Sequence, residues 1–163
     1  MSYRSALVVL LLGVLPAGPT PLRAQVARAS RASEPAAVLQ EVFAATVRGD
    51  IAALDTLFAG DSLTIIEGAG INRGWADYRD HHLVPELKEM QLTAYAPRDL
   101  DVHVTGAVAW ITFAYSLRAD VAGRTVDNIG RGTAILEFRD ARWRVRHLQT
   151  AGRARRPADP PAE

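Results

Sequence analysis

The chain has 163 residues, a formal net charge of +1 and 23% charged side chains. This length allows one domain with a substantial core, and the balanced charge excludes a general electrostatic footprint for nucleic acid or an anionic membrane. The sequence has no cysteine, which excludes disulfides, thiolate chemistry and lipid attachment at a cysteine.

The first two dozen residues have the order of a secretory signal peptide. Arg4 precedes an apolar run over residues 6–15, and small residues and prolines follow. The run is too short to span a bilayer comfortably. We therefore expect a signal peptide at residues 1–24, a linker at 25–32 and a periplasmic or secreted protein that keeps no membrane span; the alternative is an uncleaved anchor.

Two amphipathic helices are predicted next. Ser33 can cap the first, with Pro35 in its first turn, where a missing N–H has no consequence. Apolar residues recur at helical spacing as far as Gly49. Asp50 can then cap a second helix over residues 51–59.

A short strand at residues 63–67 and a third helix from Trp75 follow. The glycine-rich segment between them, residues 68–74, lacks the spacing and the parallel βαβ unit of a dinucleotide-binding loop, so we interpret it as a turn into the helix. Pro85 cannot donate to the carbonyl of His81, which predicts that this helix ends or kinks by Val84.

Beyond this helix the pattern changes to long alternating strands, at residues 92–104, 107–117, 126–139 and 142–149. Helices first and antiparallel strands second indicate an α+β domain, which we place at residues 33–153. The remaining residues, 154–163, are rich in proline and predict a disordered tail.

The last hairpin, closed by Asp140-Ala141, predicts a pocket. The expected pairs are, from the turn outward, Phe138 with Trp143, Leu136 with Val145, Ala134 with His147, and Gly132 with Gln149. Small residues opposite polar ones would leave a hollow with hydrogen-bonding groups in its wall. A β-bulge in either strand would exchange the two faces.

The preceding hairpin fits a turn at Thr105-Gly106, which puts Phe113 and Tyr115 on the inner face and His103 on the outer face. The outer face is too apolar to be bathed in water. We therefore expect a homodimer packed sheet to sheet. Its expected contact residues are Val108, Trp110, Ile135 and Leu148.

In this order and spacing the chain resembles the nuclear transport factor two-like superfamily, especially its SnoaL-like, ketosteroid-isomerase-like and calmodulin-kinase association-domain groups. The residues that carry the resemblance are Arg48-Gly49-Asp50, Ala53-Leu54, Leu57-Phe58-Ala59, Gly74 with Tyr78, and Trp143-Arg144-Val145 ahead of His147. The resemblance implies three helices on a strongly curved, mainly antiparallel sheet, with a cone-shaped pocket and commonly a dimer. It does not assign a reaction, because the same fold serves many chemistries.

His147 is the first candidate for a catalytic acid or base, since histidine ordinarily titrates near neutral pH. Tyr115 and His82 are further catalytic candidates; the alternative for His147 is a histidine that only hydrogen-bonds to the rim of the core. The predicted ligand-binding residues are Gln149, Tyr78, Trp75, Phe113, Ala134 and Gly132. His82 and Glu86 share a helical face, but zinc needs three or four ligands, so we expect no metal and no cofactor.

Two functions remain open at this point. The first is an exported protein that binds a small apolar or aromatic molecule in a mainly apolar cone. The second is a cofactor-independent isomerase, dehydratase or hydrolase in which a pocket histidine moves a proton. The sequence favours the first, because it forces no acid/base pair; a carboxylate within hydrogen-bond reach of His147 would reverse that preference.

Overall fold

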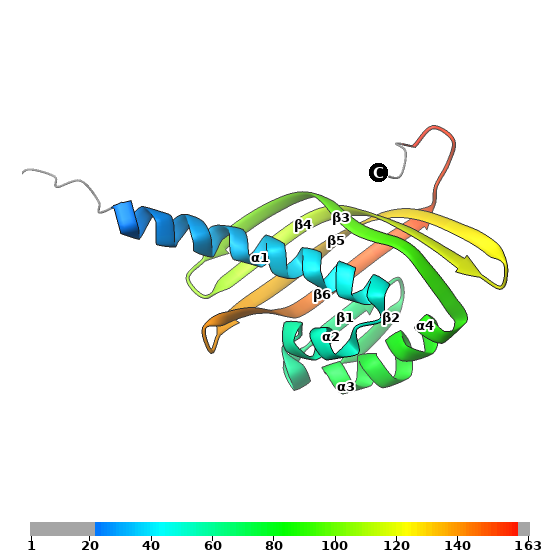
Figure 1. Cartoon of the computed structure of the whole chain (residues 1–163), viewed down its shortest axis with the longest axis horizontal. Helices are drawn as coiled ribbons and strands as arrows, with labels where there is room; N and C mark the ends of the chain where they lie inside the picture. The colour runs from blue at the N-terminus through cyan, green and yellow to red at the C-terminus, as the bar shows by residue number, and fades with distance from the viewer. Residues whose placement is uncertain (1–21, 160–163) are drawn as a thin grey trace, which may run out of the picture.

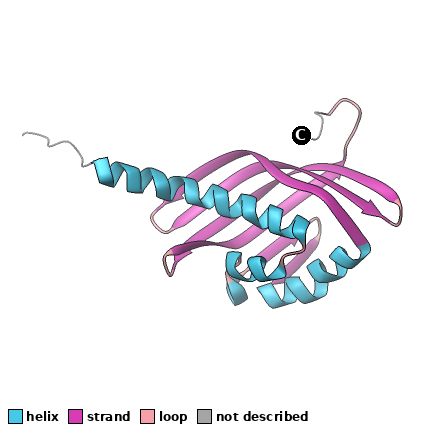
Figure 2. Ribbon diagram, viewed as in Figure 1, coloured by secondary structure: helices cyan, strands magenta, loops and turns pink. Residues whose placement is uncertain are grey.

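A strongly curved sheet of six strands wraps around a layer of helices in the computed structural model, which describes residues 22–159 (Figures 1 and 2). The helices are α1 (Leu22–Arg48), α2 (Ile51–Leu57), the short 3₁₀ helix η1 (Gly60–Ser62), α3 (Trp75–Tyr78), the π-helix η2 (Arg79–Leu83) and α4 (Val84–Glu89). The strands are β1 (Thr64–Glu67), β2 (Gly70–Arg73), β3 (Met90–Thr105), β4 (Val108–Val121), β5 (Arg124–Arg139) and β6 (Arg142–Ala154).

The strand order is β2-β1-β6-β5-β4-β3, and every pair is antiparallel except β1 with β6. Helix α1 crosses the concave face, and α2 and α3–α4 close its lower end (Figure 1). The predicted α+β fold, with helices packed on a curved and mainly antiparallel sheet, is therefore confirmed. Residues 1–21, which include most of the predicted signal peptide, lie outside the described residues, as do residues 160–163.

Helix α1 begins at Leu22, so the predicted start at Ser33 is wrong and residues 25–32, expected as a linker, continue the helix. Pro35 lies inside α1. The Ala- and Arg-rich sequence before it has high helix propensity, which offsets the backbone hydrogen bond that proline removes. The second helix begins as predicted, because Asp50 accepts a hydrogen bond from the Ala53 N–H at 3.0 Å.

Of the two outcomes predicted for the third helix, an end or a kink by Val84, the helix does not end there; its regular α-helical hydrogen bonding is instead interrupted just before Val84. The helix continues to Glu89 through the π-turn of η2, and Pro85 lies in the first turn of α4. A π-turn widens the helix by one residue, so the proline ring meets a locally altered hydrogen-bond ladder. The glycine-rich segment before this helix also differs from expectation, since it forms strand β2, paired with β1.

The β3–β4 hairpin turns at Gly106-Ala107, and Thr105 pairs with Val108. Next to this turn each β3 residue therefore pairs with a β4 residue two positions later than predicted. A shift of two leaves the faces unchanged. Phe113 and Tyr115 are buried on the inner face, and His103 stacks on Trp110 on the outer face with ring centroids 5.0 Å apart. These face assignments are confirmed.

A β-bulge at Arg146 changes the register of the β5–β6 hairpin. Next to the turn the pairs are those predicted, the last being Leu136 with Val145. The following pair is Ile135 with His147, so Arg146 is an extra residue with no pairing partner on β5.

The bulge exchanges the faces of β6 beyond it. Leu148 and Thr150 point inward and are 4% and 6% exposed, whereas His147 pairs with the outward-facing Ile135. The predicted inward positions of His147 and Gln149 are therefore wrong, and so is the predicted outward position of Leu148. One added residue shifts the alternation by one, which moves every later side chain to the opposite face.

Candidate functional site

The hollow predicted opposite Ala134 and Gly132 is filled by aromatic rings. A Cβ built on Gly132 would lie 2.4 Å from the Phe113 ring, and one built on Gly130 would lie 2.4 Å from the Tyr115 ring. Because Gly130 and Gly132 have no side chains, both rings can lie against β5. Ala134 is fully buried beside them. On the inner face Gly132 and Ala134 are thus covered by the core, so they do not form the inner-face hollow that was predicted.

The charged centre of the inner face is Glu67, at the end of β1. The inward alternation of β1 continues from Leu63 through Ile65, both buried, to Glu67, whose side chain is 25% exposed. Parallel pairing sets Glu67 beside Thr150 of β6. Its Oε2 atom is buried, so this carboxylate oxygen reaches into the protein rather than into solvent.

His82 of η2 faces this carboxylate. Its Nε2 atom lies 3.0 Å from Glu67 Oε2 and 3.3 Å from Glu86 Oε1, one helical turn further on. The imidazole stacks on the ring of Tyr78, with centroids 5.2 Å apart. His82 is therefore held by two carboxylates and one aromatic ring, while 27% of its side chain stays accessible.

Burial raises the pKa of Glu67, and the nearby charge of Glu86 adds to that rise; His82 and a hydrogen bond from the Tyr78 hydroxyl act in the opposite direction. The pKa of Tyr78 is raised well above its usual range, first by burial and then by the charge of Glu67. The Tyr78 hydroxyl therefore keeps its proton, which lets it donate to Glu67.

Two further tyrosines complete the cluster. Burial, and then the charge of Glu67, raise the pKa of Tyr95 and of Tyr115. The Tyr115 hydroxyl accepts a hydrogen bond from Thr150, and its ring meets that of Tyr95 edge to face at 5.7 Å. Both tyrosines are therefore neutral, and the charge of Glu67 acts on both.

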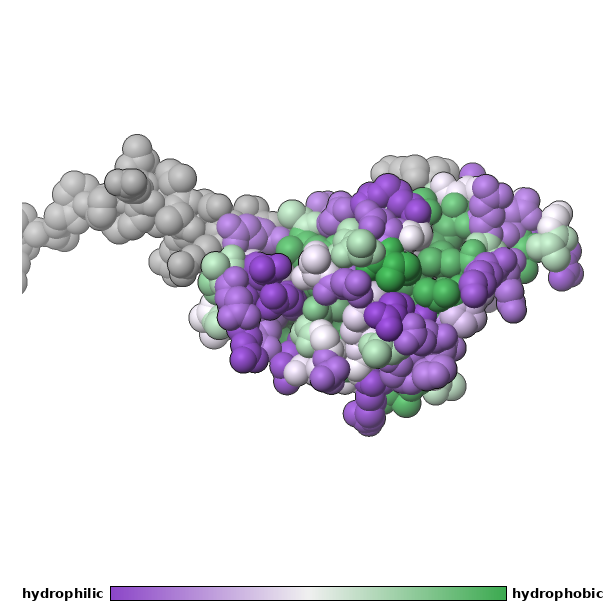
Figure 3. All heavy atoms as spheres, turned by 60° about the horizontal axis from the view of Figure 1, so that its bottom comes forward, coloured by the Kyte–Doolittle hydropathy of each residue, from purple (hydrophilic) through white to green (hydrophobic). Residues whose placement is uncertain are grey.

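The inner face continues toward the open end of the cone as apolar, partly buried side chains. They are Met90, Leu92, Leu117, Val121 and Val126, which share the face of Tyr115 by their pairing. Figure 3 shows apolar surface gathered between polar borders on the side of the molecule where α3–α4 come forward. Glu67 thus shares the inner face with an apolar surface on which a small molecule can rest.

Of the predicted site residues, the fold brings together His82, Tyr78 and Tyr115, with Phe113 in the aromatic layer beneath. Trp75 lies apart, because its indole N–H donates to Asp55 and its ring stacks on Phe58 at 4.9 Å. His147 and Gln149 lie on the outer face. None of these last three shares the cluster around Glu67.

Sequence reasoning missed Glu67, Tyr95 and Thr150. The signal for Glu67 was present, since it continues the alternation of Leu63 and Ile65 and so had to point inward. The signal for Thr150 was the change of apolar phase from Val145 to Leu148, which is three residues instead of two. Tyr95 alternates with inward residues of β3 but carries no motif.

The described residues contain no group of three or more histidine, aspartate or glutamate side chains arranged to hold a metal ion. His82 and Glu86 are in contact, as their spacing suggested, but the ring nitrogen that faces Glu86 also faces Glu67. Within the same part of the chain, no helix has the length and apolar character needed to cross a membrane.

A protein-family model described as a SnoaL-like domain matches residues 36–150. Among curated proteins no match is found. The fold is similar to that of many solved structures, including some aligned over 91% or more of their own length.

Three of these structures illustrate the range. A candidate ketosteroid isomerase from Shewanella frigidimarina NCIMB 400 is 24% identical, with 70% of this chain and 91% of that chain covered and a TM-score of 0.61. A nuclear transport factor 2-like superfamily protein from Salmonella enterica serovar Typhimurium LT2 is 18% identical, with 80% and 96% covered and a TM-score of 0.69. A candidate dehydratase from Streptomyces avermitilis is 15% identical, with 76% and 96% covered and a TM-score of 0.65.

Proposed function

For this member of the SnoaL-like domain family, within the nuclear transport factor two-like superfamily, we propose the function of a cofactor-independent acid/base enzyme of the isomerase or dehydratase kind. Its substrate is a small apolar or aromatic molecule bound in the cone. The observation that supports this is the contact of His82 Nε2 with Glu67 Oε2 at 3.0 Å. The sequence alone favoured a binding protein, because it indicated no pair of a histidine and a carboxylate. The structure contains such a pair, but its histidine is His82 and not His147.

In the proposed reaction the imidazole of His82 takes a proton from a carbon atom next to a carbonyl group of the substrate. Glu67 and Glu86 stabilise the imidazolium that forms, since both carboxylates face Nε2. An isomerase returns the proton to another carbon, and a dehydratase gives it to the departing hydroxyl, which leaves as water. The hydroxyl of Tyr115 is the proposed donor to the carbonyl oxygen of the substrate, where negative charge develops during the reaction.

The second candidate is a protein that binds the same class of molecule without converting it. The packed aromatic layer of Phe43, Tyr95, Phe113 and Tyr115 favours this alternative, because rigid rings and an apolar surface are sufficient for binding. Turnover by the wild-type protein separates the two functions.

Export and dimerisation belong to the same proposal. The basic, apolar and small-residue order of residues 1–24 supports export; mass spectrometry of the protein recovered from the periplasm of a bacterial host would give an N-terminus at Gln25. Val108, Trp110 and Ile135 are 44%, 41% and 38% exposed at the end of the outer face next to the β3–β4 and β5–β6 turns, which supports a homodimer packed sheet to sheet at that end.

The test is a screen of the mature protein against ketosteroids, cyclic enones and β-hydroxy ketones, followed by thermal shift and by ultraviolet absorbance for turnover. His82→Gln should lower kcat by about 100-fold or more and leave ligand binding within a few-fold. His81→Gln is the matched control, because His81 is the adjacent residue, is 76% exposed and contacts Asp77. Turnover that survives His82→Gln unchanged would contradict the proposed base.

A further inference from the structure

A groove with a volume of about 1160 Å³ lies on the outer face of the sheet, on the side away from the helices. Three arginines line it, Arg98 on β3, Arg131 on β5 and Arg153 on β6. It is separate from the Glu67–His82 site, whose side chains project from the inner face. The outer-face groove is therefore a second concave surface with its own charge.

Small residues between the arginines explain the hollow. Arg131 pairs with Ala114 of β4 on one side and with Ala151 of β6 on the other. Arg98 pairs with Ala114 from the far side. Paired residues share a face, so long cationic side chains stand over alanines that do not fill the space between them.

The arginines are unequally compensated. Arg98 meets the exposed Asp99 at 3.1 Å, and Arg153 meets Asp159. Among the residues that the structure describes, the side chain of Arg131 has no hydrogen bond or ion pair, and it lies in the middle of the three. The groove thus carries one uncompensated positive charge at its centre.

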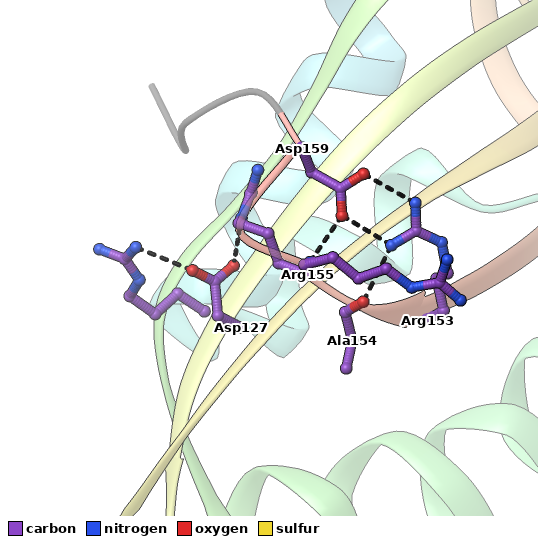
Figure 4. Close-up of polar contacts among 7 residues, drawn as sticks. Asp127, Arg153, Ala154, Arg155 and Asp159 are labelled. Atoms are coloured by element: carbon purple, nitrogen blue, oxygen red, sulfur yellow. Dashed lines mark hydrogen bonds and ion pairs between the residues drawn. The ribbon is translucent and has the colours of Figure 1, made fainter.

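The chain already holds one carboxylate in this groove. Beyond β6 the backbone turns back, and the two oxygens of Asp159 receive hydrogen bonds from both terminal nitrogens of Arg153 at 2.7 and 2.8 Å (Figure 4). The Arg156 N–H donates to the same carboxylate at 2.6 Å. Nearby, Asp127 joins Arg155 and Arg118, which ties the start of the predicted tail to the sheet.

We propose that the outer-face groove binds an organic anion, a carboxylate or a phosphate ester. The anionic oxygens pair with the guanidinium groups of Arg131 and Arg98, which suit planar oxyanions. The hydrocarbon part lies over Ala114 and Ala151. This site goes beyond the proposed enzymatic function, since its arginines stand on the opposite face of the sheet from Glu67 and His82 and carry the opposite charge to the two glutamates there.

Isothermal titration at low ionic strength with four six-carbon probes tests the proposal: hexanoate, hexyl phosphate, hexanol and hexylamine. Binding of one or both anions, with no measurable binding of hexanol or hexylamine, is expected, and the ratio of the two anions identifies the preferred head group. Equal binding of hexanol and the anions would overturn the proposal, as would no binding of either anion.

Variants locate the site. Arg131→Gln should weaken anion binding about tenfold, through loss of a charge-assisted hydrogen-bonding partner. Arg124→Gln is the matched control, because Arg124 is exposed on the same strand but outside the groove. Asp159→Asn should instead tighten binding by roughly threefold, because it frees the Arg153 guanidinium from its internal carboxylate.

Glu67→Gln distinguishes this site from the cone. Anion binding unchanged in that variant supports the outer-face groove, whatever the variant does to turnover. Anion binding that tightens clearly in Glu67→Gln, as expected for an anion beside that carboxylate, or that is unchanged in Arg131→Gln with a wild-type melting temperature, would overturn the groove assignment.

Discussion

The hydroxyl oxygen of Tyr115 lies over Gly152, where a Cβ would stand 2.4 Å from it. Gly152→Ala should therefore destabilise the protein by about 1–3 kcal/mol, the usual effect of overpacking a core. Tyr115→Phe removes the oxygen that clashes. In that background the same Gly152→Ala change should be milder by about 1 kcal/mol, as measured in a double-mutant cycle by chemical denaturation. Additive effects would mean that Tyr115 does not lie across β6.

Deletion of Arg146 should remove the β-bulge. His147 and Gln149 would then point into the core, and Leu148 would lose its burial, which alone destabilises by about 1.5–3 kcal/mol. We expect a large fall in melting temperature. Arg146→Ala keeps the bulge and removes only the exposed ion pair with Glu137, so it should change the free energy of unfolding by less than about 1 kcal/mol. Equal effects of the two changes would contradict the register.

Glu67→Gln should raise stability at neutral pH while it abolishes turnover. Burial raises the pKa of Glu67 in the folded protein, so its contribution to stability is full below the unfolded pKa and is lost as pH rises through the folded pKa. The glutamine in the variant does not ionise, so the variant does not lose this stability as pH rises. Its melting temperature should exceed that of the wild type at pH 7, and the two should converge near pH 4. A variant less stable than wild type at pH 7 would show that pairing with His82 outweighs burial.

Asp50→Ala should lower the free energy of unfolding by about 1 kcal/mol, because it removes the side-chain cap of α2. The hydrogen bond that is lost is the one from the Ala53 N–H. Asp61→Ala is a suitable control, since it removes an exposed carboxylate from η1 without removing a cap. Denaturation with urea measures both.

Trp110→Glu should prevent the proposed homodimer and leave the fold intact. Trp110 is 41% exposed on the outer face near the β3–β4 turn, stacked on His103, and a charge there cannot be buried against a second copy. Sedimentation velocity should give a dimer for the wild type and a monomer for the variant. A monomeric wild type at micromolar concentration would contradict the dimer.

The periodic segments were predictable because their patterns are local. The long strands, the Asp50 cap and the helix start at Trp75 each follow from a few neighbouring residues. The start of α1 could not be predicted in this way, because a proline usually marks the first turn of a helix. Here an Ala- and Arg-rich segment extends the helix before Pro35.

The site was harder to predict because it depends on contacts distant in the chain. Glu67 and His82 come from a strand and a π-helix that meet only in the fold. The histidine that the hairpin pattern favoured, His147, was placed by counting pairs from the turn, and that count fails at one inserted residue. Face assignments were correct for Tyr115, where the error in the turn was an even number of residues.

The bulge at Arg146 also has a consequence for comparing this sequence with others. Because β1 pairs with β6 beyond the bulge, Glu67 stands beside Thr150 only when the extra residue is present. A one-residue gap opposite position 146 in an alignment therefore marks a change in which side chains of β6 enter the cone. Such a gap carries more information about the pocket than a substitution at any single outward-facing position of that strand.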